Sequence, residues 1–192
     1  MLPSVAIVEV ADNLEGSKFV HDPDPTKNGI TQGVYDAYRH LNGKPLRTVA
    51  LIDRAEVIAI YNGNYWIPLN ASNLPHGVDF ALFQFGVNVG TGKAARIFQG
   101  ILGVPQDGII GPKTIAAAKR LDPVQLTDQV FNAQDAYYDK IYEANPTRNE
   151  PYIKGWHNRV KRARAFLAGQ SGNGGLVLLA LVLGGLLLAG KS

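Results

Sequence analysis

Two carboxylic acids near the start of the chain stand in surroundings that suit acid-base chemistry. Glu15 ends a segment with helical spacing of apolar residues (5–14), where the negative end of the helix macrodipole disfavours an ionised carboxylate and favours a proton donor. Asp24 follows in an acidic, proline-rich loop, where a carboxylate stays solvated and ionised. Glycoside hydrolysis requires one carboxyl group of each kind, and Thr26 or Thr31 could orient the attacking water. A Glu before a helix-ending Gly and a solvated turn explain the same residues without catalysis.

The order of residues around these acids resembles a known catalytic signature. From Leu14 to Thr31 the sequence reads LEGSKFVHDPDPTKNGIT. It resembles the signature of glycoside hydrolase family 108, the phage and prophage-type N-acetylmuramidases of the lysozyme superfamily, in which Glu-Gly-Gly-aromatic precedes Asp-Pro repeats and Thr-x-x-Gly-Ile-Thr. The resemblance implies Glu15 as the catalytic acid, with Asp24 and Thr26 in support. It also implies cleavage of the β-1,4 bond between N-acetylmuramic acid and N-acetylglucosamine.

The chain departs from that signature in the loop after Glu15. Ser17 replaces the second glycine, Lys18 is an extra residue before the aromatic position, and the Gly-Gly pair before the threonine is missing. The interval from the acid to the threonine is therefore about three residues shorter than in the usual pattern. Either Thr26 or Thr31 then fits the role of the working threonine.

A second resemblance covers residues 78–167. The runs FALFQFGVN, GKAARIFQ, LGV and DGIIGPKT are similar to the predicted peptidoglycan-binding domain that accompanies this hydrolase, although Gln84 stands where that family usually has Asp. The resemblance implies peptidoglycan glycan strands as the partner. Because aromatic rings can stack on sugars, Tyr65, Trp66 and Trp156 are candidate substrate-binding residues, and Asn88 of the run FALFQFGVN is a fourth. Aromatic residues at helical spacing also fit a buried core.

Composition argues against several other kinds of site. The 192-residue chain has no cysteine, and its four histidines share no metal-ligand spacing, so we expect no metal. The glycines at 86, 90 and 92 lack the strand-to-helix phosphate-binding pattern, so we expect no cofactor. Residues 1–150 hold thirteen basic and sixteen acidic residues, whereas residues 151–168 hold five basic residues and no acid. A nucleic-acid binder would show a broader basic surface, so no nucleic-acid partner is expected.

Hydrophobic spacing predicts a mostly α protein with few strands. A first helix is expected to start at Pro3–Ser4 and to end at a Gly16 cap, and residues 17–29 are expected to form a loop or a short irregular hairpin. Gly103–Thr114 is expected to be a turn in which Pro112 starts a helix. The remaining helices are predicted at 30–41, 53–66, 112–121, 124–143 and 151–167, with one or two more in 77–102.

The expected organisation has four parts. They are a lysozyme-like helical domain (1–77), a helical peptidoglycan-binding domain (78–168), a glycine-rich linker (169–175) and a C-terminal hydrophobic helix (176–190). The apolar run of the tail reaches about 17 residues with its flanking glycines, the lower limit for crossing a bilayer, and self-association is the alternative. The expected location is a phage virion membrane or the bacterial inner membrane, with action on periplasmic peptidoglycan.

Two other functions stay open at the level of the sequence. The changed loop at Ser17 and Lys18 also fits a catalytically degenerate, membrane-anchored protein that binds peptidoglycan without cutting it. The enzyme requires a Glu15 that faces an open cleft, whereas the binder tolerates a Glu15 buried against an ion-pair partner. The tail alone also fits a pore former that assists lysis. The basic stretch at 154–164 fits a solvated helix face, or contact with anionic wall polymers or lipid headgroups.

Overall fold

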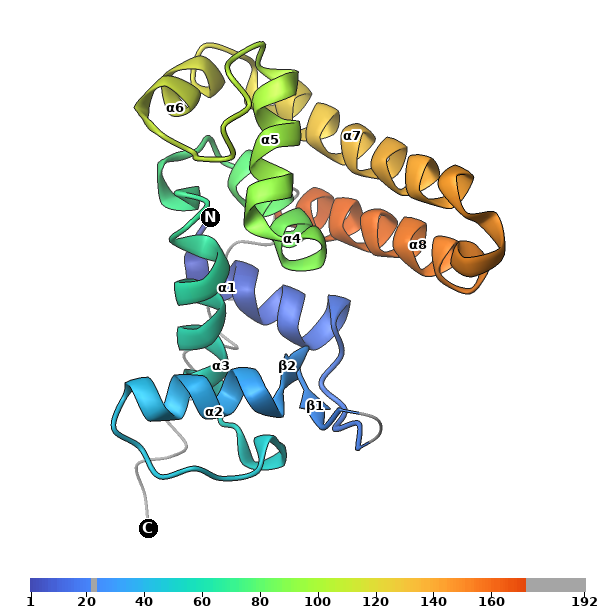
Figure 1. Ribbon diagram of the computed structural model, residues 1–192. Helices are drawn as coiled ribbons and strands as arrows, with labels where there is room; N and C mark the ends of the chain where they lie inside the picture. The colour runs from blue at the N-terminus through green and yellow to red at the C-terminus, as the bar shows by residue number, and fades with distance from the viewer. Residues whose placement is uncertain (22–23, 172–192) are drawn as a thin grey trace. The chain divides into compact units, whose positions relative to one another are not determined.

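A computed structural model describes residues 1–21 and 24–171, and the chain divides into two compact units, Met1–Tyr137 and Tyr138–Ser192. The described residues are mostly helical, as predicted, with one two-stranded antiparallel sheet (Figure 1). Within them, no helix is long and apolar enough to cross a membrane. The hydrophobic tail predicted at 176–190 lies outside the described residues.

The first helix changes its hydrogen-bonding pattern before it reaches Glu15. The α-helical turns of α1 (Pro3–Val8) begin at a proline, as predicted, and lead into a π-helical segment, η1 (Glu9–Leu14). There the Glu15 N–H donates to the Val10 carbonyl, five residues back, at 2.8 Å. Gly16 has a φ of +92° and ends the helix, which confirms the predicted glycine cap.

The segment predicted as a loop or short hairpin is a hairpin. Strands β1 (Thr26–Lys27) and β2 (Ile30–Thr31) pair antiparallel, with Thr26 opposite Thr31. Asn28 and Gly29 form the turn with φ values of 52° and 70°, the left-handed conformations that a tight hairpin requires.

The second helix starts two residues later than expected, because the residues predicted to open it complete the hairpin. It is α2 (Gln32–Leu41), capped by Thr31, whose hydroxyl accepts a hydrogen bond from the Val34 N–H. A short 3-10 turn, η2 (Val49–Leu51), follows.

The helix predicted at 53–66 is present in two parts. These are α3 (Arg54–Tyr61) and a second π-helical segment, η3 (Asn62–Trp66). Asp53 and Glu56 form a capping box at the start of α3. The first helix packs against both α3 and η3.

The core of the first unit surrounds one almost completely buried helix. Helix α4 (Val78–Val89) follows a 3-10 turn, η4 (Ala71–Asn73), and packs on α5 (Thr91–Ile101). Every residue of α4 from Val78 to Gly86 is buried. Gly86 has no room for a side chain, since a Cβ there would lie 2.6 Å from Leu69 Cδ1.

The residues of the Asp-Gly-x-x-Gly-Pro-x-Thr run form hydrogen bonds to one buried side-chain amide, that of Gln99. The Gln99 side chain donates to Asp107 at 2.6 Å and accepts from the Gly108 N–H at 2.9 Å. It also lies 3.3 Å from the Thr114 hydroxyl. Pro112 then opens α6 (Pro112–Ala118), as predicted. These contacts give the run a structural role, since they fasten the loop between α5 and α6 to α5.

The last two helices of the described residues are α7 (Pro123–Ala144) and α8 (Pro146–Ser171). Helix α8 begins five residues before the predicted start at 151, so Pro151 lies inside it. The Asn145 side chain accepts from the Arg148 N–H at 3.1 Å and caps the true start. Proline is tolerated poorly beyond the first turn, which is why the sequence suggested a later boundary.

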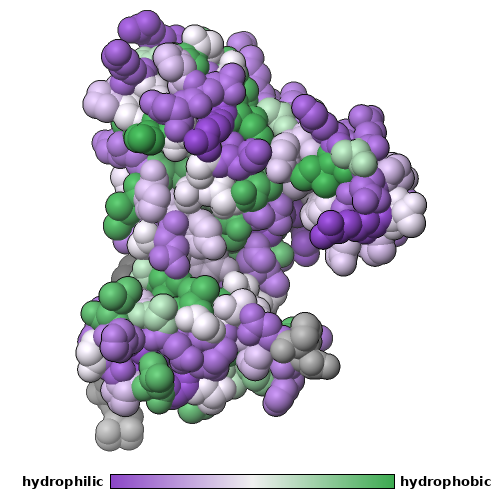
Figure 2. All heavy atoms as spheres, viewed as in Figure 1, coloured by the Kyte–Doolittle hydropathy of each residue, from purple (hydrophilic) through white to green (hydrophobic). Residues whose placement is uncertain are grey.

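Exposed apolar residues are scattered among hydrophilic ones on the face shown in Figure 2.

Candidate active site

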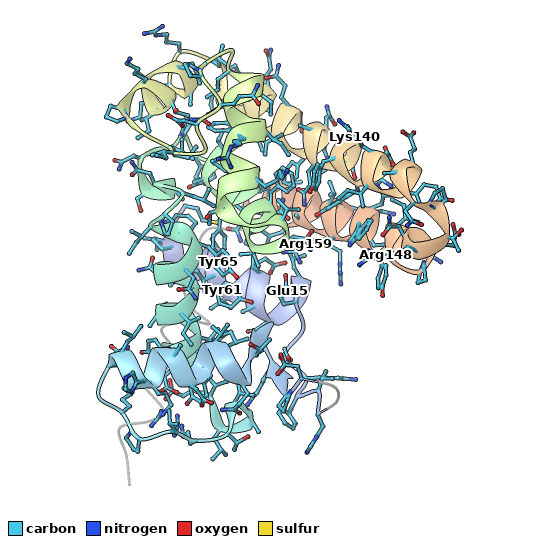
Figure 3. The ribbon with its side chains drawn as sticks, in the orientation of Figure 1. Glu15, Tyr61, Tyr65, Lys140, Arg148 and Arg159 are labelled. Carbon is cyan, nitrogen blue, oxygen red and sulfur yellow. The ribbon has the colours of Figure 1, made fainter. Side chains whose placement is uncertain are left out.

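Glu15 lies at the C-terminal end of η1 with its side chain exposed. Figure 3 shows it on the first helix, beside Tyr61 and Tyr65 from α3 and η3. A Cβ atom at Gly29 would lie 2.9 Å from both Cβ and Cγ of Glu15, and 2.6 Å from the Tyr61 hydroxyl oxygen. The hairpin turn thus packs directly on the aliphatic part of the acid, and only glycine fits there.

Two hydrogen bonds fasten this turn to the helices around it, and an ion pair joins those helices to each other. The Asn28 side-chain amide donates to Asp12 Oδ1 at 2.9 Å, and the Tyr61 hydroxyl donates to the Asn28 carbonyl at 2.7 Å. Arg54 closes the set with an ion pair to Asp12 at 2.8 Å. The first helix, the hairpin and α3 are therefore joined where Glu15 emerges.

Tyr65 adds a phenol to the same place. Burial, and secondly the negative charge of Glu15, raise the pKa of Tyr65. Its ring lies 5.6 Å from the ring of Tyr61, between centroids. Since the phenol stays protonated at neutral pH, Tyr65 can donate a hydrogen bond to a ligand that meets Glu15.

The hairpin carries the other predicted catalytic residues. Asp24 is exposed, and its backbone carbonyl accepts a hydrogen bond from the Thr26 hydroxyl at 2.8 Å. The oxygen of Thr26 therefore keeps lone pairs that can accept from water. The Thr31 oxygen instead accepts from Val34 at 3.4 Å as the cap of α2. Thr26 and Thr31 lie opposite each other in the two strands. Thr31 has a structural role, because it caps α2.

Trp66 does not present a surface to a sugar, contrary to its place among the candidate substrate-binding residues. Its side chain is 2% exposed, its indole N–H donates to Ser72 at 2.7 Å, and its ring packs edge-on against Phe83 at 5.2 Å. Gln84 is likewise buried, and it exchanges amide hydrogen bonds with Gln134. Both residues belong to the core, where their helical spacing places them.

The remaining candidates lie on other elements. Asn88 is exposed near the end of α4 in the first unit. Trp156 belongs to α8 in the second unit, where it stacks on Tyr138 and Tyr152.

A second acid of the first unit, Glu56, has a different environment. It is 2% exposed and accepts hydrogen bonds from Tyr35 at 2.5 Å, from Arg39 at 2.7 Å and from Arg47 at 2.8 Å. Burial acts to raise the pKa of Glu56, but the hydrogen bonds from Tyr35, Arg47 and Lys44 outweigh it and hold the pKa at about 2. This network ties α2, the loop after it and α3 together.

Sequence reasoning missed several supporting residues of the site. Asp12 and Arg54 gave no local signal, because their partners lie far away in the chain. The Asn28-Gly29 pair did carry one, since Asn-Gly between two short strands favours a tight hairpin turn. Among residues 1–21 and 24–171, no group of three or more acidic or histidine side chains is placed to hold a metal ion.

Comparison with known proteins places this geometry in a family. Residues 10–90 match the family model described as glycosyl hydrolase 108, and residues 93–161 match the one described as a predicted peptidoglycan domain. The two matches occur in that order and support a peptidoglycan hydrolase of the glycoside hydrolase class. The match over residues 10–90 is to the family that the sequence motifs indicated.

One solved structure shows the extent of the similarity. The chain is similar to SagA from Brucella abortus, with 28% sequence identity and a TM-score of 0.70. The alignment covers 89% of this chain and 96% of that one. No curated protein matches the chain. The family matches meet between residues 90 and 93, and the compact units meet at 137/138. Neither division tests the predicted domain boundary at 77/78, which stays a prediction.

Proposed function

We propose that this protein is an N-acetylmuramidase that cleaves the β-1,4 bond between N-acetylmuramic acid and N-acetylglucosamine, with Glu15 as the catalytic acid. The observation that carries the proposal is the exposed Glu15 at a helix end, where its aliphatic part packs on the hairpin turn and its negative charge acts on Tyr65. An acid buried in the core would have favoured a protein that only binds. The glycosyl hydrolase 108 match over residues 10–90 supports the same reaction class.

The proposed reaction uses the hairpin as the second half of the site. Glu15 donates its proton to the glycosidic oxygen as the bond to the sugar breaks, and Tyr65 donates a hydrogen bond beside it. Asp24 stabilises the developing positive charge or activates water. Thr26 accepts a hydrogen bond from that water, because its own proton is already donated to the Asp24 carbonyl.

The test compares the full chain with its Glu15→Gln variant on purified peptidoglycan. Loss of a general acid lowers rates by about 10²- to 10⁴-fold, so Glu15→Gln should stop clearing. Glu9→Gln, in the same π-helical segment, is the matched control and should clear normally. New reducing ends on muramic acid in the parent's products would identify the bond. Equal clearing by Glu15→Gln would remove Glu15 from the mechanism, and binding without clearing by every protein would indicate the degenerate binder.

We also propose that residues 176–190 associate the protein with a membrane, either in a phage virion or at the bacterial inner membrane, from which it acts on periplasmic peptidoglycan. The support is the apolar sequence of the tail. Membrane fractionation of the full chain beside a chain that ends at residue 175 tests it. The full chain should sediment with membranes and the shortened chain should not. Equal partitioning of the two would contradict the proposal.

A further inference from the structure

A groove lies where α7 turns into α8, entirely within the second unit. Its volume is about 590 Å³, and its lining includes Ile141, Asn145, Arg148, Asn149, Tyr152 and Trp156. None of these residues belongs to the site around Glu15. The surface at this turn mixes hydrophilic and apolar residues (Figure 2).

One wall of the groove is an aromatic stack. The Trp156 ring stacks on Tyr138 at 5.3 Å and on Tyr152 at 6.0 Å, with interplanar angles of 24° and 22°. Tyr138 is buried, whereas Tyr152 is 56% exposed. The stack thus runs from an anchored ring to an exposed one. A ring held in this way offers a flat apolar surface and loses little conformational entropy when a sugar covers it.

Hydrogen bonds fix the floor of the groove in advance. The Asn149 side-chain amide donates to the Ile141 carbonyl at 2.9 Å, across the turn between the helices. Asn145 caps α8 by accepting from the Arg148 N–H. The groove is therefore formed before a ligand arrives, as small-ligand sites usually are.

Arg148 supplies the charge. Its side chain is exposed at the groove, and within the described part of the chain its guanidinium has no ion-pair partner. A guanidinium group binds carboxylates through two parallel hydrogen bonds. An aromatic face beside a guanidinium fits a saccharide that carries a carboxylate. It fits a neutral sugar or a purely anionic polymer less well.

We propose that the α7–α8 groove binds the peptide-bearing muramic acid unit of peptidoglycan, with the sugar ring on Tyr152 and a stem-peptide carboxylate on Arg148. The assignment rests on the proposed function in that it takes peptidoglycan as the substrate. It goes further by naming the residues and the chemical unit that they recognise. The peptidoglycan-domain match extends over this part of α8, since it ends at residue 161.

The experiment measures sedimentation with insoluble peptidoglycan, using full chains that carry Glu15→Gln so that the strands stay uncut. Arg148→Glu and Tyr152→Ala are compared with Lys140→Glu, an exposed site on α7 that does not line the groove (Figure 3). Lys140→Glu controls for general repulsion, since it changes the net charge by as much as Arg148→Glu. Tyr152→Phe controls for folding, because it keeps the ring.

We expect about tenfold weaker binding for Arg148→Glu and for Tyr152→Ala, as for loss of one charged hydrogen bond or one aromatic contact. Lys140→Glu and Tyr152→Phe should bind as the parent does. On peptidoglycan whose carboxylates have been converted to amides with a carbodiimide and ammonia, the defect of Arg148→Glu should vanish, while that of Tyr152→Ala should remain. Groove variants that bind like Lys140→Glu would overturn the proposal, as would an equal Arg148→Glu defect on the amidated peptidoglycan.

The proposed function is read separately, from clearing by chains with Glu15 restored. If chains with Glu15 restored clear peptidoglycan and the groove variants bind it normally, the proposed groove is contradicted and the proposed hydrolase function stands. If no chain clears peptidoglycan but the groove variants bind it poorly, the proposed groove stands and the proposed hydrolase function fails.

Discussion

Two glutamates of the first unit, Glu15 and Glu56, lie at opposite extremes of environment. Glu56 is buried and receives hydrogen bonds from a tyrosine, two arginines and a lysine. Glu15 is exposed at a helix end, and its aliphatic part packs on the backbone of a glycine. The first acid is held ionised by its neighbours, whereas the second is placed where a substrate can reach it.

The comparison shows how an acid used for structure differs from an acid suited to chemistry. A carboxylate with a pKa of about 2 has no proton to donate at neutral pH, so Glu56 can only bind cations and donors. The donors around Glu56 are also its partners in the fold, because they come from α2 and the loop that follows it. Exposure and a pre-built second wall, here the hairpin, distinguish Glu15.

The largest effect on stability is expected at Glu56. In Glu56→Ala the guanidinium of Arg39 and the hydroxyl of Tyr35 lose their shared acceptor, and breaking such a buried pair costs about 3–5 kcal/mol. Chemical denaturation of the variant should show that loss in the free energy of unfolding. Glu15→Gln is the matched comparison and should unfold within about 0.5 kcal/mol of the parent, as exposed substitutions do. Equal losses at both positions would erase the distinction between the two acids.

Acid should abolish the difference between the parent and Glu56→Gln. The folded-state pKa of Glu56 lies at about 2, below its usual 4.5, so its ionised form stabilises the protein fully above pH 4.5. That contribution shrinks as the pH falls below 4.5 and is lost through the folded-state pKa of about 2, where half of the parent molecules carry a neutral side chain. Unfolding free energies of both proteins, measured between pH 6 and pH 2, should therefore converge. A constant gap across this range would mean that the ionisation of Glu56 contributes nothing.

Gly29→Ala is expected to damage both the fold and the site. The residue has a φ of +70°, and an added methyl group would meet the Tyr61 hydroxyl and the Glu15 side chain. Strain of this kind costs about 1–3 kcal/mol, and relief requires Glu15 to move. Activity per folded molecule should fall together with the melting temperature. Gly33→Ala, in open space on α2, is the control and should change neither.

The smallest effect is expected at the cap of α2. Thr31→Val removes the acceptor for the Val34 N–H and should cost about 1 kcal/mol, with hydrolysis kept once the protein is folded. Thr26→Val should instead lower the rate with little loss of stability. Parallel rate and melting measurements on the two variants decide which threonine works in the reaction. A rate loss confined to Thr31→Val would exchange their roles.

Local signals in the sequence predicted much of the fold. Gly16 and Pro112 mark a helix end and a helix start because their backbone geometry allows little else. Residues whose roles depend on distant partners could not be found in this way. Trp66 has the composition of a sugar platform, but Phe83 and Ser72 bury it. Pro151 suggested a helix boundary that the cap at Asn145 overrides.

The site itself was half predictable. Glu15 and the hairpin follow from motif and turn chemistry, whereas the fastening of the hairpin through Asp12 and Arg54 depends on residues 42 positions apart. The π-helical segments could not be predicted either, because a hydrophobic pattern with a period of 3.6 residues looks nearly the same when one turn is wider.

The wider turns before Glu15 affect how the direction of its side chain depends on the length of the chain. Each residue in an α-helix rotates the chain by about 100° around the helix axis. A π-helical segment, whose hydrogen bonds span five residues instead of four, needs about one residue more than an α-helix for the same rotation. Removing one residue from Glu9–Leu14 would therefore allow a regular helix to form with Glu15 still directed toward the hairpin turn. The segment can absorb the loss of one residue, and we expect a single-residue deletion there to keep more activity than one in a regular α-helical turn, where the residues that follow would rotate by about 100°.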